Sequence, residues 1–255
     1  MPANYKIYAT LLDAYWNYRQ SAEVWEKYWG GSENPPHSPE EFEQQQLRDL
    51  IDRINRKPFD SEAADRGTAF NELVDAAIER RMPNDMKVER IQGDTLYLVT
   101  YNDRQFIFPF YLIRDMAHHY QGALTQQRVE ALLPTAYGNV LVYGLIDELM
   151  PLTVHDIKTT GSYSVGKFRH HHQHLVYPYA LRENGVDIRR FCYDVVEFNK
   201  KGQHCGSYTE EYLFRPERDI PILRNHCEEF IRFLEEHRDE ITDKKVFAEE
   251  EPIEN

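Results

Sequence analysis

Three short runs of strand-forming residues, separated by turn signals, limit what this chain can fold into more than any other feature. The runs cover residues 128–134, 140–147 and 152–158. Gly138-Asn139 and Met150-Pro151 are turn-forming pairs between them. Runs of this length joined by tight turns predict a meander of antiparallel strands in the middle of the chain.

Segments with helical spacing lie on both sides of this predicted sheet. Further strand-type runs lie within residues 88–110, 190–198 and 207–214. The predicted helices cover residues 5–29, as one helix or a pair, 38–56, 65 or 66 onward, 111–120, 165–183 and 217–242. We therefore predict a single α/β domain with a mixed central sheet and helices at both ends. Its parts are a helical N-terminal segment, a core and an acidic C-terminal helix and tail, at residues 1–65, 66–216 and 217–255.

The composition of the 255 residues is that of an ordinary globular protein, with 41% hydrophobic residues. No apolar run approaches the roughly 20 residues of a membrane span, and Met1 to Tyr8 lacks the regions of a secretory signal. We therefore expect a cytoplasmic protein that does not contact a membrane. Cys192, Cys205 and Cys227 are too few and too scattered for a disulfide framework, which predicts reduced thiols.

The net charge of −13 argues at first against a nucleic-acid partner, because Lys and Arg supply the affinity for phosphate. The acidic excess is local, however. Residues 21–65 carry a net charge of −6 and residues 228–255 a net charge of −7. Residues 157–201 carry 8 basic and 4 acidic side chains. DNA is therefore not excluded, and we expect it to approach the basic segment.

Two carboxylates and a lysine carry the chemistry of the predicted meander. Asp147 ends one strand, and Asp156 lies near the end of the next, so both carboxylates converge at one edge of the sheet. Asp156 and Lys158 point to the same face because they are two residues apart. Mg²⁺ is bound by one or two carboxylates together with waters and phosphates, so a divalent cation suits this pattern. The cation would activate a water, with Lys158 beside the nucleophile or the developing charge. A surface ion pair within Asp-x-Lys is the alternative.

The order Gly144-x-x-Asp147, then Asp156-Ile157-Lys158-Thr159, then Gln173-x-x-x-Tyr177 resembles the motifs of the PD-(D/E)XK nuclease superfamily. Within it, the chain is similar to the RecB-like nucleases, which include phage exonucleases and CRISPR-adaptation nucleases. The resemblance covers roughly residues 5–181 and implies a restriction-endonuclease-like core. It implies that Asp147, Asp156 and the Ile157 carbonyl bind Mg²⁺ or Mn²⁺ and that Lys158 is the catalytic lysine. Gln173 and Tyr177 would face DNA or brace the site.

The same resemblance extends to the helix before the sheet. Residues 66–72 are similar to a helix-opening Gly-Thr-x-x-His motif of the family, with Asn71 at the position of the His. Asn71 or Glu72 would then contribute to the metal site, and only one of them faces it, because adjacent helical positions point about 100° apart. Glu130 is similar to a glutamate found in the preceding strand of the family, and a strand-edge surface carboxylate is its alternative.

Other features allow further interpretations. Tyr163, Lys167 and Arg169 are candidate DNA contacts in the basic segment. The histidine run 170–174 invites a transition-metal interpretation, since His170 and His174 would lie one helical turn apart. A polar helix face is the alternative. The acidic tail, residues 249–251, is expected to be disordered.

The function predicted from the sequence is a Mg²⁺- or Mn²⁺-dependent DNA nuclease. We expect an exonuclease of phage or mobile-element recombination and repair rather than a restriction enzyme. Its expected partner is DNA, and it could also form a homo-oligomer or bind a recombination protein. One alternative is a catalytically weakened nuclease-like module for binding or assembly in such a complex. Another is a metal-dependent hydrolase built on the histidine run.

Overall fold

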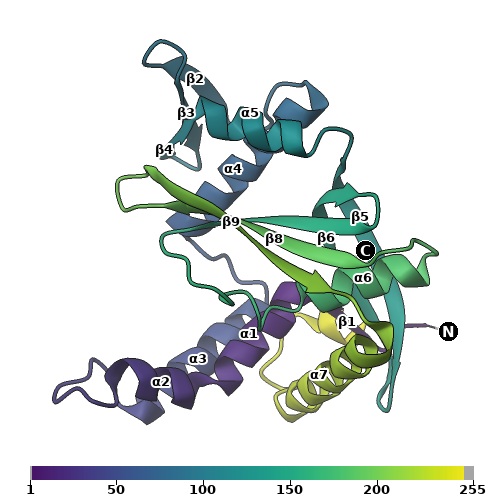
Figure 1. Cartoon of the computed structure of the whole chain (residues 1–255). Helices are drawn as coiled ribbons and strands as arrows, with labels where there is room; N and C mark the ends of the chain where they lie inside the picture. The colour runs from purple at the N-terminus through teal and green to yellow at the C-terminus, as the bar shows by residue number, and fades with distance from the viewer. Residues whose placement is uncertain (1, 250–255) are drawn as a thin grey trace, which may run out of the picture.

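The computed structural model describes residues 2–249 and centres on a six-stranded mixed sheet (Figure 1). Its strand order is β1-β6-β7-β8-β9, and β5 pairs with the other edge of β6. The strands are β1 (Tyr5–Tyr8), β5 (Leu124–Thr135), β6 (Gly138–Met150), β7 (Thr153–Thr160), β8 (Arg190–Phe198) and β9 (His204–Leu213). β5, β6 and β7 are successive antiparallel neighbours, whereas β1–β6 and β7–β8 are parallel pairs. The predicted α/β domain with a mixed sheet is confirmed.

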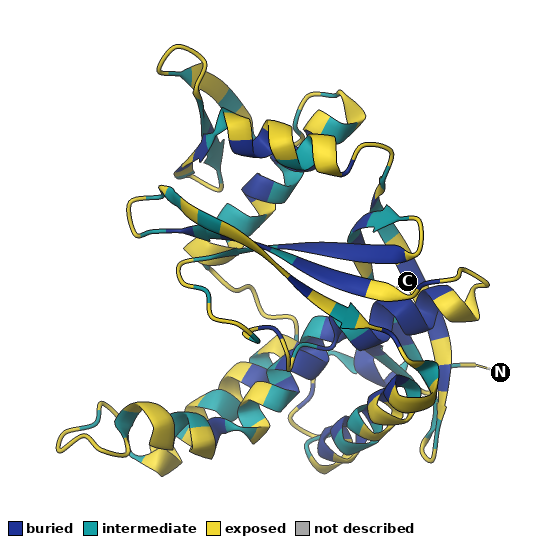
Figure 2. Cartoon of the chain, in the orientation of Figure 1, coloured by how far each residue is buried: buried dark blue, intermediate teal, exposed yellow. Residues whose placement is uncertain are grey.

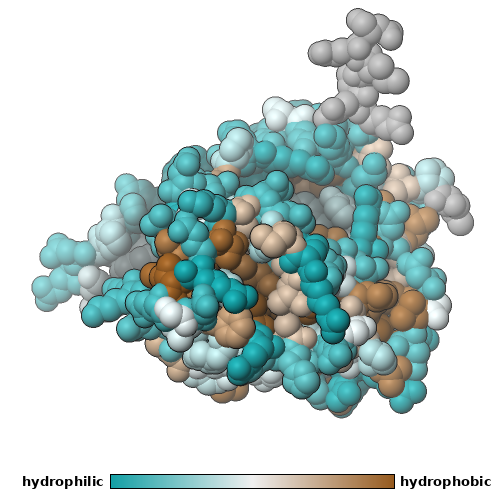
Figure 3. Space-filling model, turned by 90° about the horizontal axis from the view of Figure 1, so that it is seen from above, coloured by the Kyte–Doolittle hydropathy of each residue, from teal (hydrophilic) through white to brown (hydrophobic). Residues whose placement is uncertain are grey.

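A separate three-stranded antiparallel sheet, absent from the prediction of one central sheet, accounts for the strand-type runs near residue 100. It consists of β2 (Lys87–Ile91), β3 (Leu96–Tyr101) and β4 (Arg104–Pro109). This sheet projects with α5 at the top of Figure 1. Seen from that side, the surface is largely hydrophilic, with apolar side chains gathered around a hollow near its centre (Figure 3).

Helices cover both faces of the large sheet, and the apolar side chains form two clusters (Figure 2). One cluster joins the sheet to α1, α3, α6 and α7, and the other joins it to α4, α5 and the small sheet. The helices are α1 (Ala9–Arg19), α2 (Ser21–Trp29), α3 (Pro39–Ile54), α4 (Glu62–Glu79), α5 (Phe110–His119), α6 (Gln173–Glu183) and α7 (Pro216–Glu236), followed by the 3₁₀ helix η1 (Lys244–Phe247). Ser38 and Glu41 form the predicted capping box of α3.

Several predicted element bounds differ from the structure, and tertiary contacts explain the first two of the three differences described here. Residues 5–8 are a strand rather than a helix, because they pair with β6 and bury Ile7 completely. Residues 165–172 are not helical. Gly166 has a φ of +81°, and the backbone N–H of His172 donates to the Asp13 carboxylate. The C-terminal helix ends at Glu236 rather than near residue 242.

Three further expectations concern membrane spans, the cysteines and the acidic tail. No helix in the described part of the chain is long and apolar enough to cross a membrane. The three cysteines are free thiols, as predicted, and Cys192 and Cys227 are buried. In the acidic tail, Glu249 accepts a hydrogen bond from Arg238 (2.6 Å), whereas residues 250 and 251 lie outside the described residues.

The topology leaves a gap on one edge of β6. β1 pairs with residues 140–143 of β6, and β7 pairs with residues 148–150, while β5 takes the opposite edge. On the edge of β6 that β1 and β7 share, residues 144–147 therefore have no partner among the strands that the structure describes. β6 and β7 separate at this point, and the gap admits side chains between them.

Candidate active site

The gap in β6 brings Asp147 and Asp156 together across two diverging strands. Asp147 lies at the last unpaired position of the gap, and its Oδ2 accepts a hydrogen bond from the Ile157 backbone N–H (2.9 Å). In a strand, the N–H and C=O of one residue point to the same side, so the Ile157 carbonyl faces the gap as well. The predicted set of Asp147, Asp156 and the Ile157 carbonyl is thus assembled at one place.

Lys158 and the helix α6 hold the Asp156 carboxylate from two sides. The Lys158 Nζ lies 2.5 Å from Asp156 Oδ2, and the side chain of Asp156 is 2% exposed, so this pair is not the surface ion pair of the alternative interpretation. Gln173, the first residue of α6, donates from its Nε2 to Asp156 Oδ1 and to the hydroxyl of Tyr177 (3.2 Å). Gln173 and Tyr177 therefore brace the site, one helical turn apart.

Gly144 leaves the space that Tyr177 occupies. A Cβ atom at Gly144 would lie 2.3 Å from Tyr177 Cε1 and 2.9 Å from its hydroxyl oxygen. Tyr177 is only 5% exposed, so its ring has no free route away from the strand. The Gly-x-x-Asp and Gln-x-x-x-Tyr motifs are therefore one packing unit, in which the glycine admits the ring that orients Gln173 toward Asp156.

Helix α4 closes the gap from the other side. It passes close to β7 at Gly67, where a Cβ would lie 3.4 Å from Thr159 Oγ1, in ordinary van der Waals contact. One turn further along, Asn71 Nδ2 donates to Asp147 Oδ2 (3.2 Å). Glu72 instead binds Arg81 and accepts from the Asn84 backbone N–H (2.5 Å). As expected from helical geometry, only one of Asn71 and Glu72 faces the site, and it is Asn71.

Several buried oxygen atoms around this gap lack a hydrogen-bond partner. Among residues 2–249, such oxygens include those of Asn71, Asp75, Glu148 and Gln173, whereas Asp156 Oδ2 has only its ion pair with Lys158. Each lone acceptor in a dry environment costs free energy unless a donor or a cation satisfies it. Asp75 and Glu148, which are 1% and 0% exposed, were missed by the sequence reasoning. The signal for Asp75 was its i+4 spacing from Asn71 on one helix face.

The carboxyl groups shift one another's protonation. Burial, and next the Asp156 carboxylate, raise the pKa of Asp147 to about 8. Burial also raises the pKa of Asp156, against the opposing effect of Lys158. Burial alone would lower the pKa of Lys158, but the Asp156 and Asp147 carboxylates have the larger combined effect and raise it. Burial with Asp147 raises the pKa of Glu148 to about 10, and burial raises the pKa of Asp75 to about 6.

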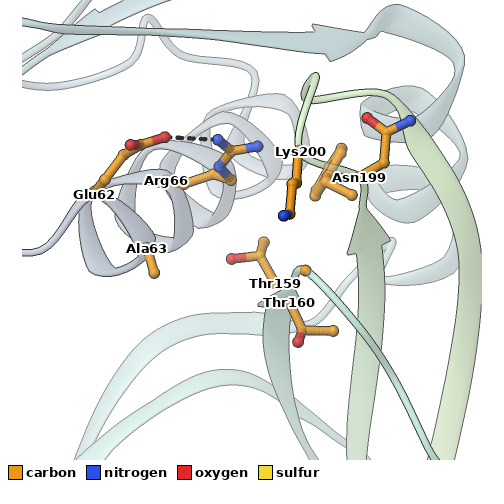
Figure 4. Close-up of a pocket in the computed structure, with 9 residues that line it drawn as sticks. Glu62, Ala63, Arg66, Thr159, Thr160, Asn199 and Lys200 are labelled. Carbon is orange, nitrogen blue, oxygen red and sulfur yellow. Dashed lines mark hydrogen bonds and ion pairs between the residues drawn. The ribbon is translucent and has the colours of Figure 1, made fainter. Parts of the chain in front are cut away.

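A shallow pocket of about 390 Å³ continues the site beyond the carboxyl end of β7 (Figure 4). Thr159 and Thr160 form its floor, and the cations of Arg66 and Lys200 point into it from α4 and from the β8–β9 turn. Glu62 is the acidic residue in the lining and pairs with Arg66 (2.9 Å). This pocket falls beside the segment that the sequence predicted to be basic.

The remaining predicted residues lie farther out. Glu130 is opposite Tyr143 in the β5–β6 register and pairs with Arg128 (3.0 Å). It therefore lies away from Asp147, and its place is that of the surface carboxylate given as its alternative. Tyr163 stacks on Tyr208, with ring centroids 4.4 Å apart. Lys167 Nζ donates to Thr160 Oγ1 (2.5 Å) and to the Ser162 carbonyl (2.7 Å), and Arg169 is exposed.

The histidine run does not form a second centre. His170 precedes α6, so it is not one helical turn from His174. His174 stacks on Tyr212, with ring centroids 4.5 Å apart, and burial lowers its pKa to about 4. His172 Nδ1 lies 2.7 Å from Asp13 Oδ1, which ties the loop before α6 to α1. These contacts give the run a structural role.

Within the described residues, no group of three or more His, Cys, Asp or Glu side chains is arranged to hold a metal ion. A cation at the gap would rest on the two carboxylates of Asp147 and Asp156, with carbonyl, amide or water oxygens completing its coordination. That is how proteins commonly hold Mg²⁺, and the unpartnered oxygens fit the role.

Comparisons with known proteins give little to set beside this geometry. No family model matches the chain, and no curated protein matches it. Among solved structures, one described as "Crystal structure of SSO0001" is similar at a TM-score of 0.41 with 10% sequence identity. The match covers 89% of this chain and 78% of that one. A likeness at this level carries no argument about fold or function.

Proposed function

We propose that this protein is a metal-dependent DNA nuclease, with its active site at the gap between β6 and β7. The observation that carries the proposal is the group of buried, unpartnered oxygens around Asp147 and Asp156, beside a half-buried lysine that is paired with Asp156. A cation would satisfy those oxygens. Lys158 would face the negative charge of a phosphodiester bound there. The family resemblance of the motifs supports the same assignment.

Asp147, Asp156 and the Ile157 carbonyl would hold the Mg²⁺ or Mn²⁺ ion. When bound, such an ion lowers the pKa of a water and stabilises charge on the attacked phosphate. Lys158 Nζ stays protonated beside Asp156, so it can stabilise the negative charge that develops on phosphate oxygens. Gln173 fixes Asp156 Oδ1, and Tyr177 fixes Gln173. Arg66 and Lys200 offer phosphate contacts beyond β7.

The test is cleavage of linear single- and double-stranded DNA with Mg²⁺ or Mn²⁺. We expect cleavage by the wild type and loss of it in Asp156→Asn and in Lys158→Ala. Lys87→Ala, which removes an exposed lysine of the small sheet far from these motifs in the sequence, is the matched control and should still cleave. The absence of cleavage by the wild type, or equal cleavage by all four proteins, would refute the proposal. End-labelled and circular substrates separate exonuclease from endonuclease action, and the exonuclease is the outcome we expect.

One observation favours the second candidate, a nuclease-like module for binding or assembly. Asn71 directs its amide nitrogen, a donor, at Asp147 Oδ2, where a metal-binding side chain would direct an acceptor. Calorimetry with Mn²⁺ separates the two functions. The nuclease predicts Mn²⁺ binding that Asp147→Asn removes, and the module predicts no binding that depends on Asp147.

A further inference from the structure

A groove with basic and aromatic walls begins at the gap and runs along the exposed face of β6. Two adjoining pockets of about 460 and 450 Å³ form it, and both include Arg128 and Tyr143 in their walls. The first pocket reaches Gly144 and Tyr177, so it touches the packing unit that braces Asp156. The groove therefore ends against two residues that support the candidate active site.

The groove is lined by more cationic than acidic side chains, although the protein is acidic overall. Lys6, Arg56, Arg128 and Lys245 line it, against one acidic side chain, Glu249. Arg56 pairs with Asp243 (2.9 Å) and Arg128 with Glu130 (3.0 Å) at its rim. The Arg128–Glu130 pair is exposed on both sides and therefore weak, so an anion in the groove can displace Glu130 from Arg128.

Aromatic rings accompany the cations. Tyr8 and Tyr143 lie with ring centroids 5.7 Å apart, and both line the pocket nearest the gap. A groove that combines cations with aromatic rings is typical of proteins that bind a single nucleic-acid strand, because the cations follow the phosphates and the rings stack on bases. An acidic peptide would use the cations but would leave the rings without a stacking partner.

We infer that this groove binds one strand of DNA and leads it to or from the gap. The inference rests on the proposed function for its choice of DNA, and it adds a binding surface that shares no lining residue with the Arg66–Lys200 pocket. The strand would run from Lys245 past Arg128 to Tyr177. Arg56 and Lys245 belong to the two most acidic segments of the sequence, yet both face this groove.

The experiment measures binding of a fluorescent single-stranded oligonucleotide in EDTA, at several salt concentrations, so that it does not depend on cleavage. Arg128→Gln should weaken binding and lower the log–log salt slope by about 0.7, the value for one phosphate contact on a single strand. Lys6→Ala with Arg128→Gln should lower it by about 1.4. Arg128 is 76% exposed, so the substitution leaves the fold intact.

Arg114→Gln is the matched control, because Arg114 is also exposed and also pairs with a neighbouring acid, Asp115 (2.7 Å), but lies on α5 outside the groove. Equal slopes for the wild type, Arg128→Gln and Arg114→Gln would overturn the inference, even if DNA is cleaved. Equal competition by polyglutamate or by phosphatidylserine vesicles would overturn the choice of DNA as occupant. Groove-dependent binding without cleavage would support the inference and refute the nuclease alone.

Discussion

Glu148 offers the sharpest test of the buried charge around the gap. Its side chain is completely buried, and neither carboxyl oxygen has a hydrogen-bond partner among the described residues. Burial and the Asp147 carboxylate raise its pKa from 4.5 to about 10. In the unfolded chain the group ionises near its ordinary pKa, whereas in the metal-free folded protein it stays protonated.

The sign of the pH dependence follows from this difference. A carboxyl group with a raised folded-state pKa contributes its full stability below the unfolded pKa and loses it as the pH rises toward the folded pKa. Each pH unit in that window removes about 1.4 kcal/mol. Between pH 5 and pH 8, Glu148 should therefore lower the free energy of unfolding by about 4 kcal/mol.

Glu148→Gln removes this titration and keeps the shape of the side chain. Measured by urea unfolding in EDTA, the variant should gain up to about 4 kcal/mol relative to the wild type between pH 5 and pH 8. Lost packing or an unpaired amide changes the free energy equally at both pH values, so it cancels in the comparison. Titration of Asp147 and Asp75 is present in both proteins.

Glu130→Gln is the control, because its carboxylate is exposed on the neighbouring strand β5. It should change the pH dependence by less than about 0.5 kcal/mol. If Glu148→Gln and the wild type lose stability in parallel from pH 5 to pH 8, Glu148 is not a buried group with a raised pKa, and the account of the site is wrong.

Three further predictions concern the same region. Gly144→Ala should lower the free energy of unfolding by about 1–3 kcal/mol through its clash with Tyr177. Tyr177→Ala in the same chain should relieve the clash, so losses of unfolding free energy that simply add in the double variant, measured by urea unfolding, would contradict this. Mn²⁺ should raise the melting temperature more at pH 8 than at pH 5, since a pKa near 8 keeps Asp147 protonated at pH 5; a pH-independent shift in calorimetry would contradict it. Asp194→Ala should cost about 2–4 kcal/mol, because Asp194 accepts hydrogen bonds from Tyr120 (2.7 Å) and from Thr209 (2.6 Å); an unchanged urea midpoint would show that these donors find other acceptors.

Much of the fold followed from local pattern, and the errors share one cause. The meander β5–β6–β7, the capped helix α3 and the strand β8 follow from alternation, turns and caps, which depend on neighbouring residues. Residues 5–8 lie next to helical pattern, but they are a strand because β6 offers a free edge. The pairing partner is more than 130 residues away, so no local pattern contains it.

The candidate site shows the same division. The spacing of Asp147, Asp156 and Lys158 was readable because strand geometry fixes which side chains share a face. Glu148 was not, because its importance lies in the lack of donors around its carboxyl oxygens, which is a property of packing, and Asp75 offered only its helical spacing from Asn71.

The sequence by itself determined the motif residues, the mixed α/β class and the total charge. Only the tertiary structure decided where β6 and β7 separate, which helix faces the gap and where the charge lies. Charge along the chain placed the cations at residues 157–201, but Lys6, Arg56 and Lys245 come from other segments and meet at one groove. The physical reason is that a strand or a helix exposes one face, so the charge of a segment and the charge of the surface it presents are different quantities.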